Sequence, residues 1–174
     1  VVVNCAGVWV EGPSDTMTEE MWNRTMNINL KGTFFINRYA IPELEKTQGC
    51  IVNVSSNDGL TGDPGAAVYC ASKGGVCLLT QSLAVELAPR RIRVNAVCPG
   101  DVMTPMLAGQ AKIYGKGDPD NYYRKLLSLY PQGRYVRFIR PEEIAETVFF
   151  LASEAAAPIT GVCLAVDFGA TAGL

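Results

Sequence analysis

Histidine is absent from this chain of 174 residues, and its absence excludes several kinds of active site. A Ser-His-Asp triad needs an imidazole, and so do the common zinc sites. No apolar run reaches the roughly 18 residues of a membrane span, and no stretch resembles a signal peptide. A formal net charge of -2 provides no basic face, so we expect neither nucleic acid nor a membrane surface as a partner.

Six cysteines are present, and each stands alone inside an apolar stretch, with no C-x-x-C pattern. This pattern is typical of buried thiols that act as small hydrophobic side chains in a reducing compartment, so it predicts a cytoplasmic protein without a metal site. A disulfide or metal framework is the alternative interpretation. The cysteines are Cys5, Cys50, Cys70, Cys77, Cys98 and Cys163.

Short β-branched runs alternate with longer helical segments along the chain, which is 48% hydrophobic and long enough to bury a core. The alternation predicts one α/β domain over residues 1–174, a Rossmann-like, doubly wound parallel sheet of about four strands with helices on both faces. The predicted strands lie in residues 1–3, 49–56, 92–100 and 161–169, and the predicted helices in 14–44, 67–89 and 141–154.

The chain opens on three valines, with no polar residues before them. Such a run predicts a strand that is buried on both faces, as in the middle of a parallel sheet. Chain termini usually lie at the surface instead. We therefore expect these residues to form only the C-terminal portion of the fold, with an upstream region missing.

Distinctive residues follow three of the predicted strands, at the edge where parallel sheets bind ligands. The first strand leads into Asn4, Ala6 and Gly7, the second ends at Ser56, and the third at Pro99 and Gly100. Each motif taken alone has an ordinary interpretation, either as a tight turn or as a capping serine. Together they place a candidate site at the carboxyl edge of the sheet.

Tyr69 and Lys73 are four residues apart on a predicted helix, so both side chains project from one face. A free phenol has a pKa near 10, and a neighbouring ammonium lowers it toward the range of a general acid or base. Ser56 is close enough along the chain to reach the same substrate oxygen. Gly74 and Gly75 weaken the helix, which predicts a close approach to another backbone or a place beneath a cofactor.

Seven blocks appear in order along the chain: "NCAG", "NINLKG", "IVNVSS", "YCASKGG", "VNAVCPGDVMT", "RPEEIA" and "ITGVCLAVDFG". They span essentially all 174 residues, and through them the chain closely resembles the short-chain dehydrogenase/reductase family. The resemblance implies that Tyr69 is the acid/base, that Lys73 lowers its pKa and holds the nicotinamide ribose, and that Ser56 orients the substrate. Asn29 resembles the residue that holds a relay water leading to Lys73; a helix kink or cap is its other interpretation.

The resemblance also implies a dinucleotide site. Asn4, Ala6 and Gly7 match the family's segment that runs under the adenosine half of the cofactor. Pro99, Gly100 and Thr104 match its wall beside the nicotinamide, where the backbone at Val102 and the hydroxyl of Thr104 would hydrogen-bond the carboxamide. By comparison with the family, a βαβαβ half of about 80 residues with a glycine-rich phosphate loop is missing before Val1. That half would carry the side chain that separates the two cofactors, so the prediction is NAD or NADP.

The segment 105–137 holds five tyrosines and several cations, and family members differ most here. One interpretation is a substrate-binding lid over a partly apolar alcohol or ketone; the other is a helix-turn-helix whose tyrosines pack on the body. We expect an NAD(P)-dependent oxidoreductase that acts on small alcohols or ketones and forms a homo-oligomer, either a dimer or a tetramer. The alternative function is a catalytically silent, truncated family member that serves as an oligomeric binding or structural module.

Overall fold

The computed structural model describes residues 1–173 and contains a four-stranded, wholly parallel sheet in the order β1-β2-β3-β4. The strands are β1 (Val2–Asn4), β2 (Cys50–Val54), β3 (Arg93–Pro99) and β4 (Cys163–Val166). Because consecutive parallel strands require crossover connections, helical chain links each strand to the next. The α/β fold predicted from the sequence is confirmed.

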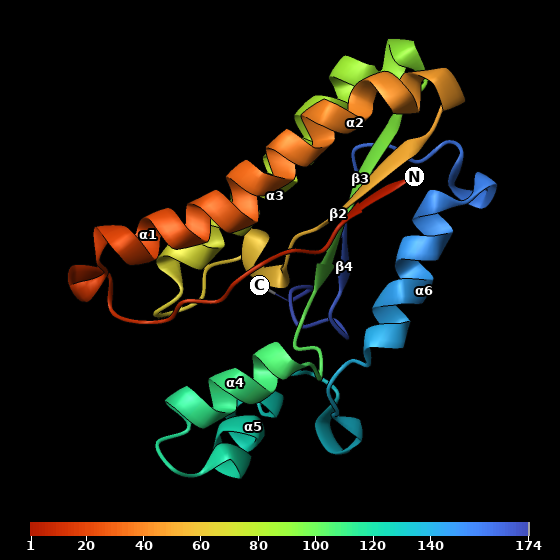
Figure 1. Cartoon of the computed structure of the whole chain (residues 1–174). Coiled ribbons are helices and arrows are strands. Elements are labelled where there is room, and N and C mark those ends of the chain that lie inside the picture. The colour runs from red at the N-terminus through yellow and green to blue at the C-terminus, as the bar shows by residue number, and fades with distance from the viewer. Residues whose placement is uncertain (174) are drawn as a thin grey trace.

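Helices cover both faces of the sheet, as predicted, and two more lie beyond the carboxyl ends of the strands (Figure 1). On one face lie α1, α2 and α3, on the other lies α6, and α4 and α5 extend past the end of β3. The bounds are α1 (Glu19–Met26), α2 (Thr33–Thr47), α3 (Ala67–Leu87), α4 (Pro105–Tyr114), α5 (Pro119–Leu127) and α6 (Pro141–Ala152). Short helical turns are η1 (Ser14–Thr16), η2 (Asn27–Gly32), η3 (Asn57–Gly59), η4 (Ala88–Arg90), η5 (Gly133–Tyr135) and η6 (Glu154–Ala156).

The core is divided by the sheet into two clusters, because neighbouring strand residues point to opposite faces. Ile51 belongs to the cluster under α2 and α3, whereas Val52 packs with Leu151 of α6, and both strand residues are fully buried. Burying such a side chain is worth roughly 1.5–3 kcal/mol. The clusters fix the strands between the two helical layers and so hold their carboxyl ends in place.

A single helical run extends from α1 through η2 into α2, and a π-helical turn at Asn27–Gly32 interrupts its regular winding. Thr18 caps the start of this run, accepting a hydrogen bond from the Met21 amide (3.2 Å). Pi-helical turns often occur at functional sites, because the extra residue redirects a side chain. Here the turn carries Asn29 into the interior, where it is fully buried.

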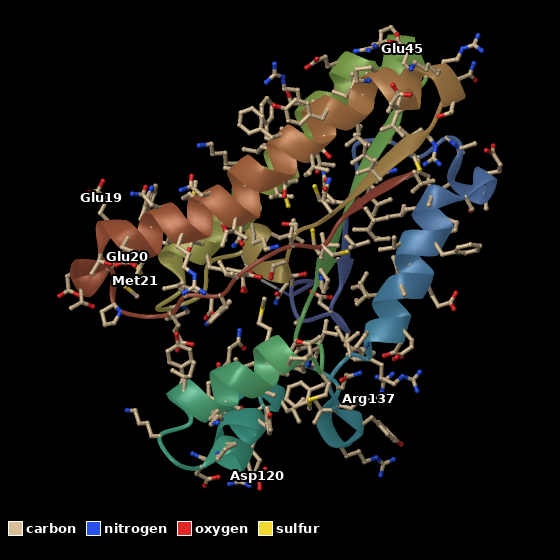
Figure 2. The ribbon with its side chains drawn as sticks, viewed as in Figure 1. Glu19, Glu20, Met21, Glu45, Asp120 and Arg137 are labelled. Carbon is tan, nitrogen blue, oxygen red and sulfur yellow. The ribbon has the colours of Figure 1, made fainter. Side chains whose placement is uncertain are left out.

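Two acidic residues mark the ends of the molecule. Glu45, near the end of α2, and Asp120, on α5, lie at opposite ends of the structure (Figure 2). Across the described residues, no helix combines the length and apolar character that crossing a bilayer requires.

Beyond β4, Phe168 has a left-handed backbone (φ 53°), and the Arg137 guanidinium lies 4.8 Å from its ring centroid. Glycine would adopt that φ without strain.

Candidate active site

The fold brings the predicted trio together at the carboxyl end of β2. Tyr69 and Lys73 face inward from the first two turns of α3, and both are buried. Ser56, just past β2, is also buried, and its side chain interacts with the phenol of Tyr69. The Lys73 ammonium nitrogen lies 5.7 Å from the centroid of the Tyr69 ring, so the i, i+4 spacing aligns the two groups as expected.

Lys73 is a buried cation whose contacts are mostly to uncharged groups. Its Nζ donates a hydrogen bond to the Val54 carbonyl oxygen (2.9 Å), and none of the ion pairs between described residues involves it. Burial lowers the pKa of Lys73 to about 8, against smaller opposing effects from nearby thiols and the Asp58 carboxylate. An ammonium has three N–H donors, so this one retains donors for a ligand.

Tyr69 departs from the electrostatic expectation. Burial raises the pKa of its phenol above the ordinary value, the Asp58 carboxylate adds to the rise, and the Ser56 side chain opposes it. The indole of Trp9 packs against the phenol, with ring centroids 4.4 Å apart. The expectation of a pKa lowered by Lys73 is therefore wrong for the chain by itself, because desolvation and a nearby carboxylate act on the phenol more strongly than the ammonium.

Asp58 lies within the electrostatic reach of the trio. Burial, together with the Asp63 and Asp101 carboxylates, raises its pKa to about 7, while Ser56 and Lys73 act in the opposite direction. The Ser56 hydroxyl accepts a hydrogen bond from the Asp58 amide (3.2 Å) and donates one to Asn57 Oδ1 (3.1 Å). The serine must therefore exchange its bond to Asn57 before it can donate to a substrate oxygen.

Asn29 fixes the chain that leaves β1. Its Oδ1 accepts a hydrogen bond from the Val8 amide (2.8 Å), and its Nδ2 donates to the Val8 carbonyl (3.0 Å) and to Ser72 Oγ (3.0 Å). A Cβ added to Gly7 would stand 3.5 Å from both Asn29 Oδ1 and Lys73 Nζ. Glycine at this position thus leaves Asn29 and Lys73 facing a shared space, and the asparagine is more than a helix cap.

Asn4 belongs to a buried polar cluster, which we call the asparagine network: Asn4, Asn37, Asn53 and Thr80. Asn4 Nδ2 donates to Asn37 Oδ1 (2.6 Å) and to Asn53 Oδ1 (2.9 Å), and Asn53 Nδ2 donates to Thr80 Oγ1 (3.0 Å). Asn4 and Asn53 are direct partners in the β1–β2 register. The network ties the ends of β1 and β2 to α2 and α3, and it leaves Ala6 exposed beyond the strand.

The chain after β3 is held by a tyrosine from the segment 105–137. The Asp101 amide donates to the Tyr130 hydroxyl (2.6 Å), which donates in turn to Asp101 Oδ2 (3.1 Å). A side chain on Gly100 would collide with this hydroxyl, at 2.6 Å. Val102 forms a β-bridge with Ile139. These contacts fix the course of the chain that leads from Pro99 to Thr104.

Thr104 begins α4, and its hydroxyl accepts a hydrogen bond from the Leu107 amide (3.4 Å). Accepting that bond leaves the hydroxyl proton free to be donated elsewhere. Helices α4 and α5 form a helix-turn-helix, which we call the arm (residues 105–127), and its Tyr114 hydroxyl accepts from the Glu11 amide (3.3 Å). The arm thus contacts the chain after β1 from across the strand ends.

Packing explains only one of the two adjacent glycines in α3, Gly75. A Cβ on Gly75 would lie 2.7 Å from Leu30 Cδ2 in the π-helical turn, whereas a Cβ on Gly74 would make an ordinary contact of 3.6 Å with the Gly59 carbonyl. The closest backbone approach is made by Gly59 itself, where a Cβ would lie 2.8 Å from the Lys73 carbonyl oxygen. The predicted close approach is therefore present, but Gly59 provides it.

Sequence reasoning did not identify Trp9 or Asp58 as residues of this site, and it singled out Tyr130 only as one of the five tyrosines of segment 105–137. Asp58 follows Ser56 by two positions, and an acidic residue so near a predicted catalytic serine was a usable signal. Nothing local pointed to the contacts of Trp9 with Tyr69 and of Tyr130 with Asp101, because they join residues 60 and 29 positions apart.

Comparisons with known proteins agree with this geometry. The profile described as Enoyl-(Acyl carrier protein) reductase matches residues 1–171. A 3-oxoacyl-[acyl-carrier-protein] reductase of Thermotoga maritima is 42% identical over 170 residues, covering 97% of this chain and 65% of the relative. An inactive 2-(S)-hydroxypropyl-CoM dehydrogenase 2 of Xanthobacter autotrophicus is 43% identical over 172 residues, covering 98% and 73%.

Among solved structures, ElxO with NADP bound has a TM-score of 0.86 at 32% identity, covering 98% of this chain and 66% of the other. The chain therefore spans about two thirds of the length of the relatives it matches, from 65% to 73%. A family match across residues 1–171 and relatives above 40% identity agree with the order of motifs and with the site geometry. The chain belongs to the short-chain dehydrogenase/reductase family.

Proposed function

We propose that this chain carries the catalytic portion of a nicotinamide-dependent oxidoreductase that interconverts a small alcohol and its ketone. The observation that carries the proposal is the buried Lys73 ammonium, one helical turn from Tyr69 and paired with no carboxylate among the described residues. A buried cation without a counterion is costly unless a ligand uses it. The name of the Thermotoga maritima relative, a reductase, supports the same reaction class.

The residues present fit NAD or NADP at the strand ends. Lys73 retains donors for the ribose hydroxyls, and the exposed Ala6 leaves the end of β1 open to a flat ligand. Thr104 has a free hydroxyl proton for the carboxamide, beside the backbone at Val102 and the Pro99–Gly100 turn. When bound, the nicotinamide supplies or accepts the hydride and, in its oxidised form, adds positive charge. The NADP in the ElxO structure supports this choice of ligand.

In the proposed mechanism, Tyr69 gives a proton to the substrate oxygen during reduction and removes it during oxidation. Ser56 turns from Asn57 to hydrogen-bond the same oxygen and stabilises the developing charge. Lys73 holds the nucleotide and stabilises the phenolate. The raised pKa of Tyr69 means that the phenol stays protonated until the positive charge of the bound cofactor is present.

Asn29 holds the segment after β1 and, in this proposal, also a water that relays protons toward Lys73. The shared space beside Gly7 supports that role, because Asn29 Oδ1 and Lys73 Nζ both border it. We propose that residues 105–137 bind the substrate, with the arm over the strand ends. Its Tyr114 contact with Glu11 supports a place across the site, and its tyrosine contacts also fit the helix-turn-helix interpretation.

The test is a titration of the purified chain with NADH and NADPH, following energy transfer from Trp9, which packs on Tyr69. We expect saturable transfer that falls in Trp9→Phe, where Trp22 remains as a donor, and binding that is weakened at least tenfold in Lys73→Met. In a longer chain that includes residues encoded upstream of Val1, Tyr69→Phe should abolish turnover and spare binding. Retained turnover in that variant would mean that another group is the acid.

A silent binding or structural module is the second candidate. It is supported by the phenol pKa, which is unsuited to neutral-pH chemistry without a cofactor, and by the 43% identical relative named as inactive. The same titration separates the two candidates. Failure of both nucleotides to bind, in the chain and in its longer form, favours the module and contradicts the oxidoreductase.

We also propose that the protein is a homo-oligomer, either a dimer or a tetramer, formed through the outer faces of α2 and α3. Leu78 and Val85 of α3 are 69% and 79% exposed, and Phe34 with Leu79 borders a hollow of about 480 Å³ beside them. Sedimentation should find an assembly at micromolar concentration, and a monomer would contradict it.

We further propose a cytoplasmic location, which the six free cysteines support.

A further inference from the structure

Three of the six cysteines meet beneath the strand ends, although the sequence separates them widely. Cys77 Sγ lies 3.8 Å from Cys98 Sγ, and the Cys163 thiol donates to the Cys77 carbonyl oxygen (3.6 Å). All three are free thiols. The prediction of buried thiols is confirmed for Cys50, Cys77 and Cys98, whereas Cys70 and Cys163 are only partly buried and Cys5 is exposed, so the prediction is wrong for Cys5. The expectation that each cysteine stands alone is wrong for Cys77 and Cys98, whose sulfur atoms are in contact.

The cluster adjoins the candidate active site from below. Cys77 follows Lys73 by four residues, so it continues the inner face of α3, and Cys98 directly precedes Pro99 at the end of β3. The Cys77 thiol also lies 3.2 Å from the hydroxyl of Ser55, whose neighbour is Ser56. A bond between Cys77 and Cys98 would join α3 to β3 under the residues proposed to hold the cofactor.

We propose that Cys77 and Cys98 are a redox modification site, forming a reversible disulfide when the protein meets a peroxide. A disulfide has a sulfur–sulfur distance of about 2.05 Å, so the two thiols are within about 2 Å of bonding distance. Both sit on regular elements, α3 and β3, that pack against each other. The thiol of Cys163 donates to the backbone carbonyl of Cys77, whereas the thiol of Cys98 lies against the Cys77 sulfur itself, so we assign Cys98 as the partner.

The reaction is an ordinary two-electron oxidation. The Cys77 thiolate attacks a peroxide oxygen, forming an S–O bond and breaking the O–O bond, and the other oxygen leaves as hydroxide and is protonated to water. The sulfur of Cys98 then attacks the sulfenic acid. The S–S bond forms, the S–O bond breaks, and a second water leaves with the Cys98 thiol proton. The two thiols lose two electrons and the peroxide gains them.

Electrostatics support the same division of roles. Hydrogen bonding with the Cys163 and Cys98 thiols lowers the pKa of Cys77, and Ser55 and the Lys73 ammonium lower it further. The same thiol contacts, together with burial, raise the pKa of Cys98. Cys77 is thus the nucleophile that a peroxide oxidises, and Cys98 is the protonated resolving thiol.

The most exposed thiol of the cluster lies on the side of β4. Cys163 is partly exposed on this edge strand, next to the exposed Gln81, whereas Cys77 and Cys98 are buried. In this proposal hydrogen peroxide, which is about the size of water, enters on this side, and a bulky alkylating reagent does not. We therefore expect oxidation of the folded protein without alkylation of Cys98.

The experiment treats the folded chain with hydrogen peroxide, alkylates it in denaturant, digests it and maps the cysteine peptides by mass spectrometry. We expect a linked pair of peptides carrying Cys77 and Cys98, lighter by two hydrogen atoms and released by dithiothreitol. Cys50, buried in β2 without a cysteine among its hydrogen-bond partners in the described chain, serves as the internal control and should remain a free thiol.

Two variants sharpen the result. Cys163→Ala should still form the link, whereas Cys98→Ala should leave a sulfenic acid on Cys77 that dimedone traps. If Cys98→Ala fails to fold, the map of the unsubstituted chain still decides. The proposal is overturned if Cys77 and Cys98 both remain thiols while Cys5 oxidises, or if the link joins Cys77 to Cys163. The readout is mass rather than turnover, so it is independent of the proposed enzyme activity.

Discussion

The floor of the site and the arm are built in opposite ways. The floor is made of buried polar side chains on the sheet and α3, and the asparagine network, Lys73 and Asn29 are hydrogen-bonded within it. The arm has few buried residues: two in α4 and none in α5. Single tyrosine contacts, such as that of Tyr130 with Asp101, fasten the segment 105–137 to the body.

The difference separates chemistry from specificity. The groups that we propose for the chemistry are fixed by several hydrogen bonds from different elements, so removing one leaves its partners unpaired. The arm, which we propose selects the substrate, has few core contacts, so replacing its side chains should leave the sheet undisturbed. The predictions below test this contrast, beginning with the largest expected effect.

Removing the centre of the asparagine network should be strongly destabilising. Asn53 is fully buried and hydrogen-bonds Asn4, Asn37 and Thr80. Asn53→Ala leaves the polar groups of these partners unpaired, so it should lower the free energy of unfolding by about 3 kcal/mol. The matched change in the segment 105–137 is Leu129→Ala, at a side chain that is 71% exposed, with an expected loss below about 0.5 kcal/mol. Urea denaturation measures both, and equal losses would remove the contrast.

Asp58 should make stability depend on pH. Its pKa is about 7 when folded and 3.8 otherwise, so the folded state keeps a proton that the unfolded state releases between these values, and stability falls as pH rises from 4 to 7. Asp58→Asn should remove about 2 kcal/mol of that fall, a figure reduced for partial exposure. Urea denaturation at pH 5 and pH 8 measures it.

The control for this pH dependence is Asp120→Asn, at an exposed carboxylate on α5 (Figure 2), which should leave the slope unchanged. Asp63 and Asp101 also have raised pKa values, so a smaller slope should persist in Asp58→Asn. An Asp58→Asn protein with the full slope of the parent would show that other groups cause it.

Tyr130→Phe should loosen the chain after β3 without unfolding the sheet. The Asp101 amide loses its acceptor, so its hydrogen exchange should accelerate about tenfold, corresponding to about 1.4 kcal/mol. Tyr135→Phe, at an exposed ring, is the control and should leave that amide unaffected. Hydrogen exchange followed by mass spectrometry resolves this region, and unchanged protection in Tyr130→Phe would show that the bridge of Val102 with Ile139 suffices.

The smallest effect concerns the glycine pair in α3. Gly74→Ala adds a methyl at an ordinary contact distance and should gain up to about 1 kcal/mol from helix propensity. Gly75→Ala gains the same propensity but pushes on Leu30, so it should be less stable than Gly74→Ala. Thermal unfolding measures the difference, and the reverse order would mean that Leu30 yields freely.

More of the floor than of the arm could be predicted from the sequence, because local patterns mark the floor. Strand ends, the i, i+4 pair and small residues are local patterns, so the positions of Ser56, Tyr69 and Lys73 followed from them. The sign of the Tyr69 pKa shift did not, because burial by Trp9 and the charge of Asp58 depend on tertiary contacts. The same holds for the cysteine cluster, which three separate elements assemble.

The most direct test of the account is the ionisation of Tyr69 itself, followed by ultraviolet difference titration of the chain against Tyr69→Phe, with and without saturating NAD⁺. The account predicts a phenol that ionises above its ordinary pKa of about 10 without the nucleotide and at a lower pH with it. A phenol that ionises near neutrality without the nucleotide, or at the same pH in both states, would contradict it.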